Sequence, residues 1–208
     1  MSNLTVAARN IRKDFNRRTV FRDLHFALAG AGMSLAITGR NGSGKSTLVK
    51  ILAGVLTPSK GDVEYRLDGI RIGPDDLRHV LGLVSPYLQL YDEFTAQENI
   101  DLLCAMRGSG RADPANIDRL FEAMSLRQRR NDLVRTYSSG MKQRLKYIFA
   151  LVHKPLLLIL DEPSSNLDAE GISAVRTLVD EQKERGILVV ATNDVLEAGW
   201  CVERLHLG

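Results

Sequence analysis

The chain has 208 residues, 44% of them hydrophobic and 25% charged, a composition typical of a globular protein with a sizeable core. Its 28 basic and 25 acidic residues leave a formal charge of +3, too small to indicate a nucleic-acid partner. Residues 156–160 form the longest central apolar run, far below the roughly 20 residues of a membrane span. We therefore expect no nucleic acid and no direct membrane span. The two distant cysteines and the N-terminus without an apolar signal stretch favour a reducing compartment.

Short apolar runs alternate with helical patterns along most of the chain. Such runs are typical of strands covered on both faces in a parallel sheet, and their alternation with helices predicts an α/β fold. The predicted strands are Leu4–Arg12, His25–Leu28, Met33–Thr38, Leu81–Ser85, Leu156–Leu160, Ile187–Ala191 and Trp200–Leu207. A helix is expected over Asp168–Arg185, with Ile172, Val175, Leu178 and Val179 as its buried stripe.

The middle of the chain differs, because it carries only helical patterns. Thr95 to Glu98 fits a capping box, Arg107–Gly110 breaks the helix that follows, and Asp113-Pro114 opens another. A third helix is expected from Ser139, and Cys104 is expected in the core. The apolar stripe of the third helix is Met141, Leu145, Ile148, Phe149 and Val152. We therefore predict one domain over 1–208, with an α/β core (1–91 and 154–208) and an inserted helical subdomain (92–153).

A glycine-rich segment follows the strand predicted at Met33–Thr38. Its residues, Gly39, Arg40, Asn41, Gly42, Ser43, Gly44, Lys45, Ser46 and Thr47, fit the phosphate-binding pattern G-x-x-x-x-G-K-[ST] between a strand and a helix. The glycines let backbone N–H groups surround a phosphate, and the helix N-terminus adds partial positive charge. Lys45 is expected to reach the β- and γ-phosphates and Ser46 to bind Mg²⁺. The alternative is a glycine turn with an incidental lysine.

Two carboxylates, Asp161 and Glu162, end the apolar run at Leu156–Leu160. Residues at such a strand end face the ligand crevice of an open α/β sheet. We expect Asp161 to orient Mg²⁺ or its waters, and Glu162 to polarise the water that attacks the γ-phosphate. Without the phosphate-binding loop, this pair would be read as a solvated loop.

The segment from Tyr137 to Leu145, YSSGMKQRL, resembles the LSGGQ signature of ABC-family ATPases, and Ser164 to Asp168 resembles the D-loop of that family. The resemblance covers essentially the whole chain. It implies a P-loop NTPase fold, a RecA-like α/β core with an N-terminal antiparallel β subdomain and a helical subdomain. It also implies that Phe15 stacks on adenine, although Phe15 equally fits the core of the β subdomain. On the same resemblance, we expect Asp168, the last residue of the D-loop segment, to belong to the nucleotide-binding residues.

The same resemblance implies a head-to-tail homodimer or pseudo-dimer with two ATP molecules and Mg²⁺ between the subunits. Ser138, Ser139 and Gly140 lie where a helix begins, and free N–H groups there favour an anion. In the family arrangement these residues meet the γ-phosphate on the opposing chain. The alternative is an ordinary helix cap.

Two positions depart from the family pattern. Pro86 stands where the family usually has a glutamine, and Gln89 is either its substitute as an oxygen ligand for Mg²⁺ or water, or a solvated loop residue. Asn193 stands where the family usually has histidine. Asparagine can hydrogen-bond a γ-phosphate but cannot become cationic, so we expect slower hydrolysis than with histidine.

The resemblance predicts the ATP-hydrolysing subunit of an ABC transporter, peripheral on the cytoplasmic face of a membrane, with separate permease subunits. The loop around Tyr87, Tyr91 and Phe94 is expected to meet the permease, unless these aromatics fill the core of the helical subdomain. The signature variant and the short C-terminus resemble exporters, and residues 85–99 with Asn193 resemble haem exporters of cytochrome c maturation. Two alternatives are a soluble ABC protein acting on ribosomes or DNA, and a regulatory ATP-dependent clamp that hydrolyses slowly.

Overall fold

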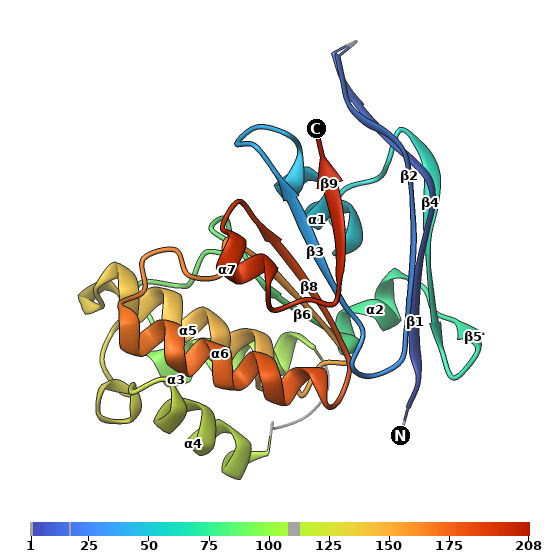
Figure 1. Cartoon of the computed structure of the whole chain (residues 1–208). Coiled ribbons are helices and arrows are strands. Elements are labelled where there is room, and N and C mark those ends of the chain that lie inside the picture. Colours follow the sequence, from blue (N-terminus) through green and yellow to red (C-terminus); the bar gives the residue numbers. More distant parts are fainter. Residues whose placement is uncertain (1, 17, 108–112) are drawn as a thin grey trace.

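The computed structural model describes residues 2–16, 18–107 and 113–208. Two sheets and a group of helices make up the fold, and Figure 1 shows the parallel sheet between the antiparallel sheet and the helices. This arrangement confirms the predicted architecture of an α/β core with an antiparallel β subdomain and a helical insertion.

The antiparallel sheet has the strand order β2-β1-β4-β5. Its long first strand alternates buried Leu4, Val6 and Ala8 with more exposed residues, and then buries Ile11 after a register shift. Asn10 lies within this irregularity with a φ of 52°, so a bulge resets the alternation that the sequence pattern followed. The strands are β1 (Leu4–Phe15), β2 (Arg18–Ala29), β4 (Lys60–Leu67) and β5 (Ile70–Arg71).

The parallel sheet has the order β6-β7-β8-β3-β9, and all of its pairings are parallel. Its central strands are buried on both faces, which explains their continuous apolar runs. The strands are β3 (Ser34–Gly39), β6 (Leu81–Val84), β7 (Leu157–Asp161), β8 (Ile187–Thr192) and β9 (Glu203–Leu207). The α/β core also includes four helices: α1 (Lys45–Leu52), α2 (Pro74–Val80), α6 (Ala169–Lys183) and α7 (Val195–Ala198).

Three helices lie between β6 and β7 in the sequence: α3 (Ala96–Met106), α4 (Pro114–Ala123) and α5 (Ser139–Leu151). Two short 3₁₀ turns, η1 (Arg127–Arg129) and η2 (Val134–Thr136), connect α4 to α5. The predicted capping box is present, because Thr95 N–H donates to Glu98 Oε2 at 2.8 Å and Glu98 N–H donates to Thr95 Oγ1 at 3.1 Å. Asp113 caps α4, as its sequence predicted. In the predicted break at Arg107–Gly110, residues 108–110 lie outside the described residues.

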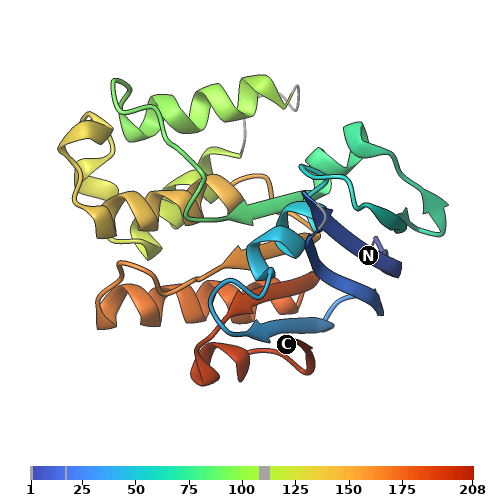
Figure 2. The same ribbon diagram turned by 90° about the horizontal axis from the view of Figure 1, so that it is seen from above.

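Two hydrophobic cores cover the two faces of the parallel sheet. Leu157 and Ile159 of β7 face the core shared with α1 and the antiparallel sheet, whereas Leu158 and Leu160 face the core shared with α3 to α6. Alternate residues of one strand thus join the two halves of the molecule. Figure 2 shows α1 between the antiparallel sheet and the helical subdomain in a view from above.

Two details differ from the sequence predictions, and a third agrees with them. Ile172 is 36% exposed and does not join the buried stripe of α6, because Val175, Leu178 and Val179 face the sheet instead. The last strand begins at Glu203, since Trp200 packs into the helical core within a turn. Cys104 is buried, as predicted.

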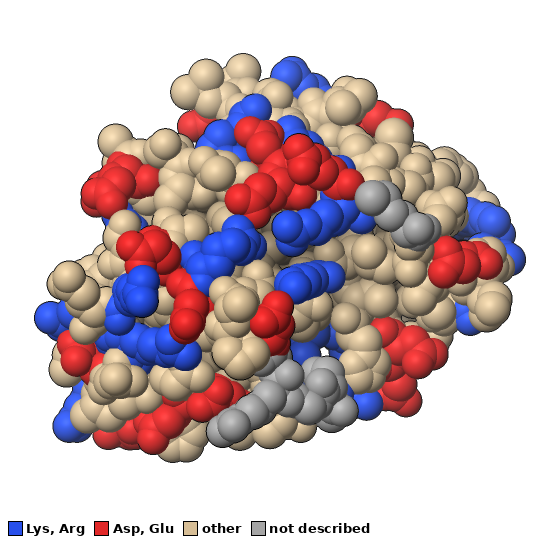
Figure 3. All heavy atoms as spheres, turned by 90° about the horizontal axis from the view of Figure 1, so that it is seen from below, with Lys and Arg blue, Asp and Glu red and all other residues tan. Residues whose placement is uncertain are grey.

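The surface at the helical end carries charges of both signs. Figure 3, a view from below, shows basic and acidic side chains interspersed over this face. Several form ion pairs that link neighbouring elements, such as Arg119 to Glu181 at 2.7 Å and Lys142 to Asp92 at 2.7 Å. Exposed pairs of this kind contribute about 0–1 kcal/mol each, so packing of the two cores holds the fold together.

Candidate nucleotide-binding site

The carboxyl ends of four parallel strands meet at one edge of the sheet. The glycine-rich loop follows β3, Asp161 ends β7, Asn193 follows β8, and the segment with Tyr87 follows β6. Ligands of open α/β sheets bind in the crevice outside the carboxyl ends of the strands. The sheet order therefore gathers residues that lie far apart in the sequence, as the contact between Asn41 and Asn193 illustrates with a separation of 152 positions.

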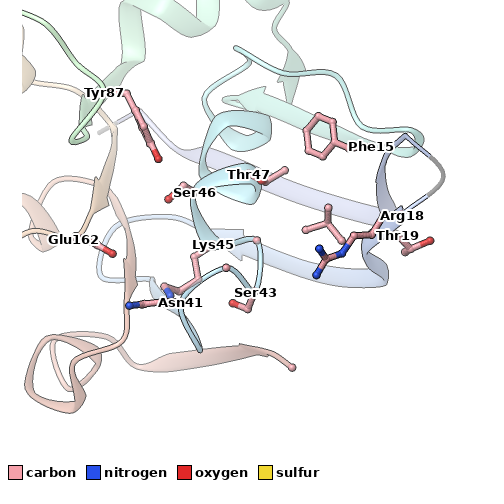
Figure 4. Close-up of a pocket in the computed structure, with 14 residues that line it drawn as sticks. Phe15, Arg18, Thr19, Asn41, Ser43, Lys45, Ser46, Thr47, Tyr87 and Glu162 are labelled. Atoms are coloured by element: carbon pink, nitrogen blue, oxygen red, sulfur yellow. The ribbon is translucent and has the colours of Figure 1, made fainter.

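A cavity of about 760 Å³ opens at this edge. In Figure 4, Phe15, Arg18 and Thr19 lie at one end of it, and Tyr87, Ser46 and Glu162 lie at the other, with the glycine-rich loop between them. The lining residues are Phe15, Arg18, Thr19, Val20, Asn41, Gly42, Ser43, Gly44, Lys45, Ser46, Thr47, Tyr87, Glu162 and Gly208. The cavity thus has an aromatic and basic end and an acidic end, separated by the N-terminus of α1.

The backbone of the loop requires glycine at two places. Gly39 has a φ of 148°, and a Cβ there would lie 2.2 Å from the carbonyl oxygen of Leu207. Gly44 has a φ of 104°, and a Cβ there would lie 2.5 Å from the side chain of Val20. Both φ values belong to the region that favours glycine, so the loop can adopt its path only with these residues. That path brings the N-terminus of α1 to the cavity.

Lys45 is 5% exposed and lies under the loop that it ends. Its Nζ donates to the carbonyl oxygens of Gly39 at 2.9 Å and Arg40 at 3.2 Å. These contacts satisfy a buried ammonium group, which would otherwise be costly to remove from water. The positive charge is therefore held at the centre of the cavity, where a phosphate on the N-terminus of α1 would meet it.

Asp161 is the most unusual polar residue of the site. It is 1% exposed, and neither of its carboxylate oxygens has a hydrogen-bond partner within the described ranges. Burial raises the pKa of Asp161, and the hydroxyl of Ser46 opposes this shift without reaching either oxygen in hydrogen-bond geometry. Two free carboxylate oxygens beside a serine hydroxyl are donors that Mg²⁺ prefers. The residues present therefore fit a magnesium ion.

Glu162 lies next to Asp161 but has a different environment. Its backbone adopts a φ of 51°, and its N–H donates to the carbonyl oxygen of Ala191 at 2.9 Å. A glutamate in the left-handed region is uncommon and costs roughly 1 kcal/mol or more. This conformation places the side chain at the wall of the cavity, where Figure 4 shows it facing the Ser46 end.

Phe15 lies at the opposite end of the cavity and is 47% exposed, so it is not a core residue of the antiparallel sheet. Lys13 Nζ lies 4.9 Å from the centre of its ring. Arg18 pairs with Phe15 in the β1–β2 hairpin, and Arg18 and Thr19 also line the cavity. The sequence analysis missed these two residues, because it predicted no hairpin after Phe15 that would bring them beside its ring.

Asn193 contacts the glycine-rich loop directly. Its Nδ2 donates to Oδ1 of Asn41 at 3.1 Å, and it shares a neighbouring hollow with Gly39 and Arg40. Gly39, Arg40 and Asn193 therefore line this neighbouring hollow and not the main cavity, whereas Asn41 lines the main cavity and contacts Asn193. The amide of Asn193 is engaged by the loop itself.

The signature residues lie away from this cavity. Ser138 caps α5 by accepting a hydrogen bond from Met141 N–H at 3.2 Å, and Ser138 and Ser139 are exposed. Gly140 faces the backbone of Asn166, because a Cβ there would lie 3.0 Å from its carbonyl oxygen. Within the described chain, none of the three signature residues lines the cavity of the glycine-rich loop. The structure does not bring these two predicted groups together in one chain.

Asp168 serves a structural role in this chain. Its carboxylate caps α6 by accepting from Gly171 N–H at 2.9 Å, and it pairs with Arg144 of α5 at 2.5 Å. The Gly171 N–H and then Arg144 lower the pKa of Asp168, because both stabilise the ionised form. These contacts join the segment after β7 to α5. The role of Asp168 in binding nucleotide stays a prediction.

The loop after β6 has a different layout from the one expected. Gln89 is exposed and lines a second cavity, of about 410 Å³, with Ser139, Lys142 and Gln143 of α5. The structure does not bring Gln89 together with Ser46 and Glu162 in the main cavity, and its role toward Mg²⁺ remains a prediction. Tyr87 lines the main cavity instead. Sequence reasoning placed Tyr87 only on the permease side of this loop.

A glycine-rich loop on a parallel sheet, with a buried lysine and a buried aspartate at one cavity, defines a nucleotide-binding protein of the P-loop class. The chain belongs to the ABC transporter family, whose model matches residues 21–165. The glycine-rich loop and the Asp161–Glu162 strand end both lie within the matched residues.

Similar proteins include two linked by name to resistance or export. The linearmycin resistance ATP-binding protein LnrL of Bacillus subtilis is 31% identical over 91% of this chain and 61% of its own length. The Nod factor export ATP-binding protein I of Bradyrhizobium diazoefficiens is 30% identical over 95% of this chain and 64% of its own. The chain thus spans about three fifths of the length of these relatives.

An import protein and a solved structure are also similar. The aliphatic sulfonates import ATP-binding protein SsuB of Pseudomonas fluorescens is 33% identical over 98% of this chain and 73% of its own. The solved structure of an ATP-binding subunit of an ABC transporter superimposes with a TM-score of 0.84 and is 27% identical, covering 97% of this chain and 85% of that one.

The burial of Asp161 predicts that replacing its carboxylate stabilises the fold at neutral pH but not at acid pH. Because its pKa is raised in the folded chain, its proton stabilises the fold below pH 3.8, and this contribution is lost as the pH rises through the folded pKa. Asp161→Asn should therefore raise the free energy of unfolding of the nucleotide-free chain at pH 7 by about 1 kcal/mol or more. Urea denaturation in chelator measures it.

The same gain should shrink as the pH falls below 3.8, because the carboxyl group then becomes protonated in the unfolded state as well. Glu162→Gln is the matched control, since this adjacent carboxylate is exposed and its replacement should change stability little. An unchanged or lower stability of Asp161→Asn at pH 7 would contradict the assignment of a free buried carboxylate.

Proposed function

We propose that this chain hydrolyses ATP to ADP and phosphate and thereby drives a separate membrane permease, in the direction of export. One observation carries the proposal: Lys45, Ser46 and Glu162 line one cavity, with the unpartnered carboxylate of Asp161 beside them. A cation, a hydroxyl and two carboxylates of different exposure are the groups that phosphoryl transfer to water requires.

The shape of the cavity gives the nucleotide a direction. The exposed ring of Phe15 offers a stacking surface for adenine, and Arg18 and Thr19 offer polar contacts beside it. The triphosphate would then follow the loop of residues 39–47, with N–H groups of α1 and Lys45 around the β- and γ-phosphates. The γ-phosphate would end beside Glu162 (Figure 4).

Glu162 has the position and exposure of a general base. Its carboxylate faces the cavity at the γ-phosphate end and can accept a proton from a water placed between the two. Ser46 and Asp161 would hold Mg²⁺, which when bound neutralises charge on the phosphate oxygens. Gln89, predicted as a further metal ligand, would have to leave its present cavity to join them.

The exposed cap of α5 supports a dimer in which two chains share each nucleotide. Ser138, Ser139 and Gly140 offer hydroxyls and N–H groups at the start of a 13-residue helix, outside the cavity of their own chain. Such a helix start attracts an anion. We infer a head-to-tail homodimer, or a pseudo-dimer with a related chain, in which this cap meets the γ-phosphate bound by the partner.

Within the part of the chain that the structure describes, no helix combines the length and apolarity needed to cross a bilayer. The proposed permease would dock at the loop after β6, where Tyr91 and Phe94 are both exposed and lie 5.6 Å apart. Their exposure argues against the alternative that they fill the helical core. The chain would then lie on the cytoplasmic face of the membrane.

Export rests on the signature variant and on the relatives named for resistance and Nod factor export, against one named for sulfonate import. The narrower assignment to haem export rests only on the resemblance of residues 85–99 and Asn193. Purification from membranes, with identification of the permease chain that accompanies this one, distinguishes export from import.

The proposal predicts a strong dependence of turnover on Glu162. Phosphate release from ATP by the wild-type chain should fall by about 100-fold or more in Glu162→Gln, because a general base contributes roughly 10² to 10⁴. ATP binding should persist in this variant. Little phosphate release from both proteins would favour the regulatory clamp, which Pro86 and the engaged amide of Asn193 motivate.

Asn193 gives a second kinetic prediction. Histidine at this position can carry a charge, and a charged hydrogen bond to the γ-phosphate exceeds a neutral one by about 1 kcal/mol. Asn193→His should therefore raise turnover in the assembled complex by about fivefold. Asn193→Gln, which stays neutral, is the control. An unchanged or lower rate for Asn193→His would contradict a role of the missing charge.

A further inference from the structure

The loop after β6 lacks a glutamine where the family pattern has one, because Pro86 occupies that position and offers no side-chain hydrogen bond. The next residue, Tyr87, lines the cavity of the glycine-rich loop. Figure 4 shows its hydroxyl end pointing toward Ser46, on the side of the cavity that also holds Glu162 and opposite Phe15. A phenol group therefore stands at the end of the cavity assigned to the γ-phosphate.

Two contacts hold Tyr87: one reaches its ring from α1, and the other holds its backbone within its own loop. Lys50 Nζ of α1 lies 4.1 Å from the centre of the ring, a favourable position for a cation over an aromatic face. The backbone N–H of Tyr87 donates to Oγ of the buried Ser85 at 3.3 Å. Tyr87 is 65% exposed, and of these two contacts the one with Lys50 bears on its ring.

The same loop is tied to the helical subdomain. Lys146 of α5 donates to the carbonyl oxygens of Ser85 at 3.2 Å and Pro86 at 3.5 Å. α5 is also the helix that Ser138 caps. Ser85 and Pro86 are therefore held by α5, whereas the ring of Tyr87 contacts α1.

We propose that Tyr87 takes the place of the missing glutamine and donates its phenol O–H to a γ-phosphate oxygen of bound ATP. A phenol can donate a hydrogen bond to a phosphate oxygen, which neither Pro86 nor the distant Gln89 does in this arrangement. ADP lacks this oxygen, so Tyr87 distinguishes the two nucleotides. The inference rests on the proposed function, since it requires ATP in this cavity.

The proposal also assigns Lys50 as a positioning residue. Its ammonium group holds the ring against α1. Lys50 therefore acts on the nucleotide only by positioning Tyr87. Loss of this cation should weaken ATP binding through a less ordered ring, and the loss should be smaller than the loss caused by removing the hydroxyl.

The test measures affinities for Mg-ATP and Mg-ADP by calorimetry in the full chain carrying Glu162→Gln, which prevents turnover. Tyr87→Phe removes only the hydroxyl and keeps the ring over Lys50. We expect it to weaken ATP binding by about tenfold, as for loss of a hydrogen bond to a charged group, and to leave ADP binding unchanged. Tyr91→Phe, the same change at a tyrosine that does not line the cavity, should keep the ratio of the two affinities.

Two results would overturn the proposal. Unchanged affinities for both nucleotides in Tyr87→Phe would leave the ring as a contact for the permease, and an equal loss of both affinities would make the hydroxyl merely structural. Failure of the proposed function is distinguishable from either result, because the Glu162→Gln chain with Tyr87 intact would then bind no ATP. Lys50→Gln, like Tyr87→Phe, should lower the ratio of the affinity for ATP to the affinity for ADP. No change in this ratio would contradict the positioning role of Lys50.

Discussion

The parallel sheet is the constraint on which the site depends, because it alone brings the chemistry of four distant segments to one edge. β3 delivers the glycine-rich loop, and β7, which is two strands away in the order, delivers Asp161 and Glu162. The two cores that cover the sheet fix the strands from both sides. The sheet therefore holds Lys45 and the two carboxylates at one edge.

At this edge of the sheet, one positive and one negative side chain are placed where an anion and a cation can bind them. Lys45 is buried on backbone carbonyl oxygens that a phosphate can replace, and Asp161 is buried with no partner for either oxygen in the described chain. An unpaired buried carboxylate lowers the stability of the empty protein. This cost is consistent with a residue whose role is binding, because a cation that binds the Asp161 carboxylate would offset the loss of stability.

The sequence was sufficient for features that depend on local chemistry and insufficient for those that depend on the path of the chain. The glycine-rich loop, the Asp161–Glu162 strand end and the caps at Thr95 and Ser138 follow from short patterns with their own physical causes. The bulge near Asn10 interrupts the alternation of β1, so the hairpin that carries Arg18 to the cavity was not predicted. Likewise, Lys146 contacts the loop after β6, and Tyr87 rather than Gln89 lines the main cavity; no spacing in the sequence encodes this arrangement.

The central claim is that nucleotide joins two chains, with the phosphate-binding loop of one facing the serine cap of the other. Its most direct test is the mass of the Glu162→Gln chain by light scattering with Mg-ATP and with Mg-ADP. We expect a dimer with ATP and a monomer with ADP, and a return to monomer with ATP when Ser138 is also replaced by alanine. A chain saturated with ATP that stays monomeric, or a dimer that forms equally with ADP, would contradict the account.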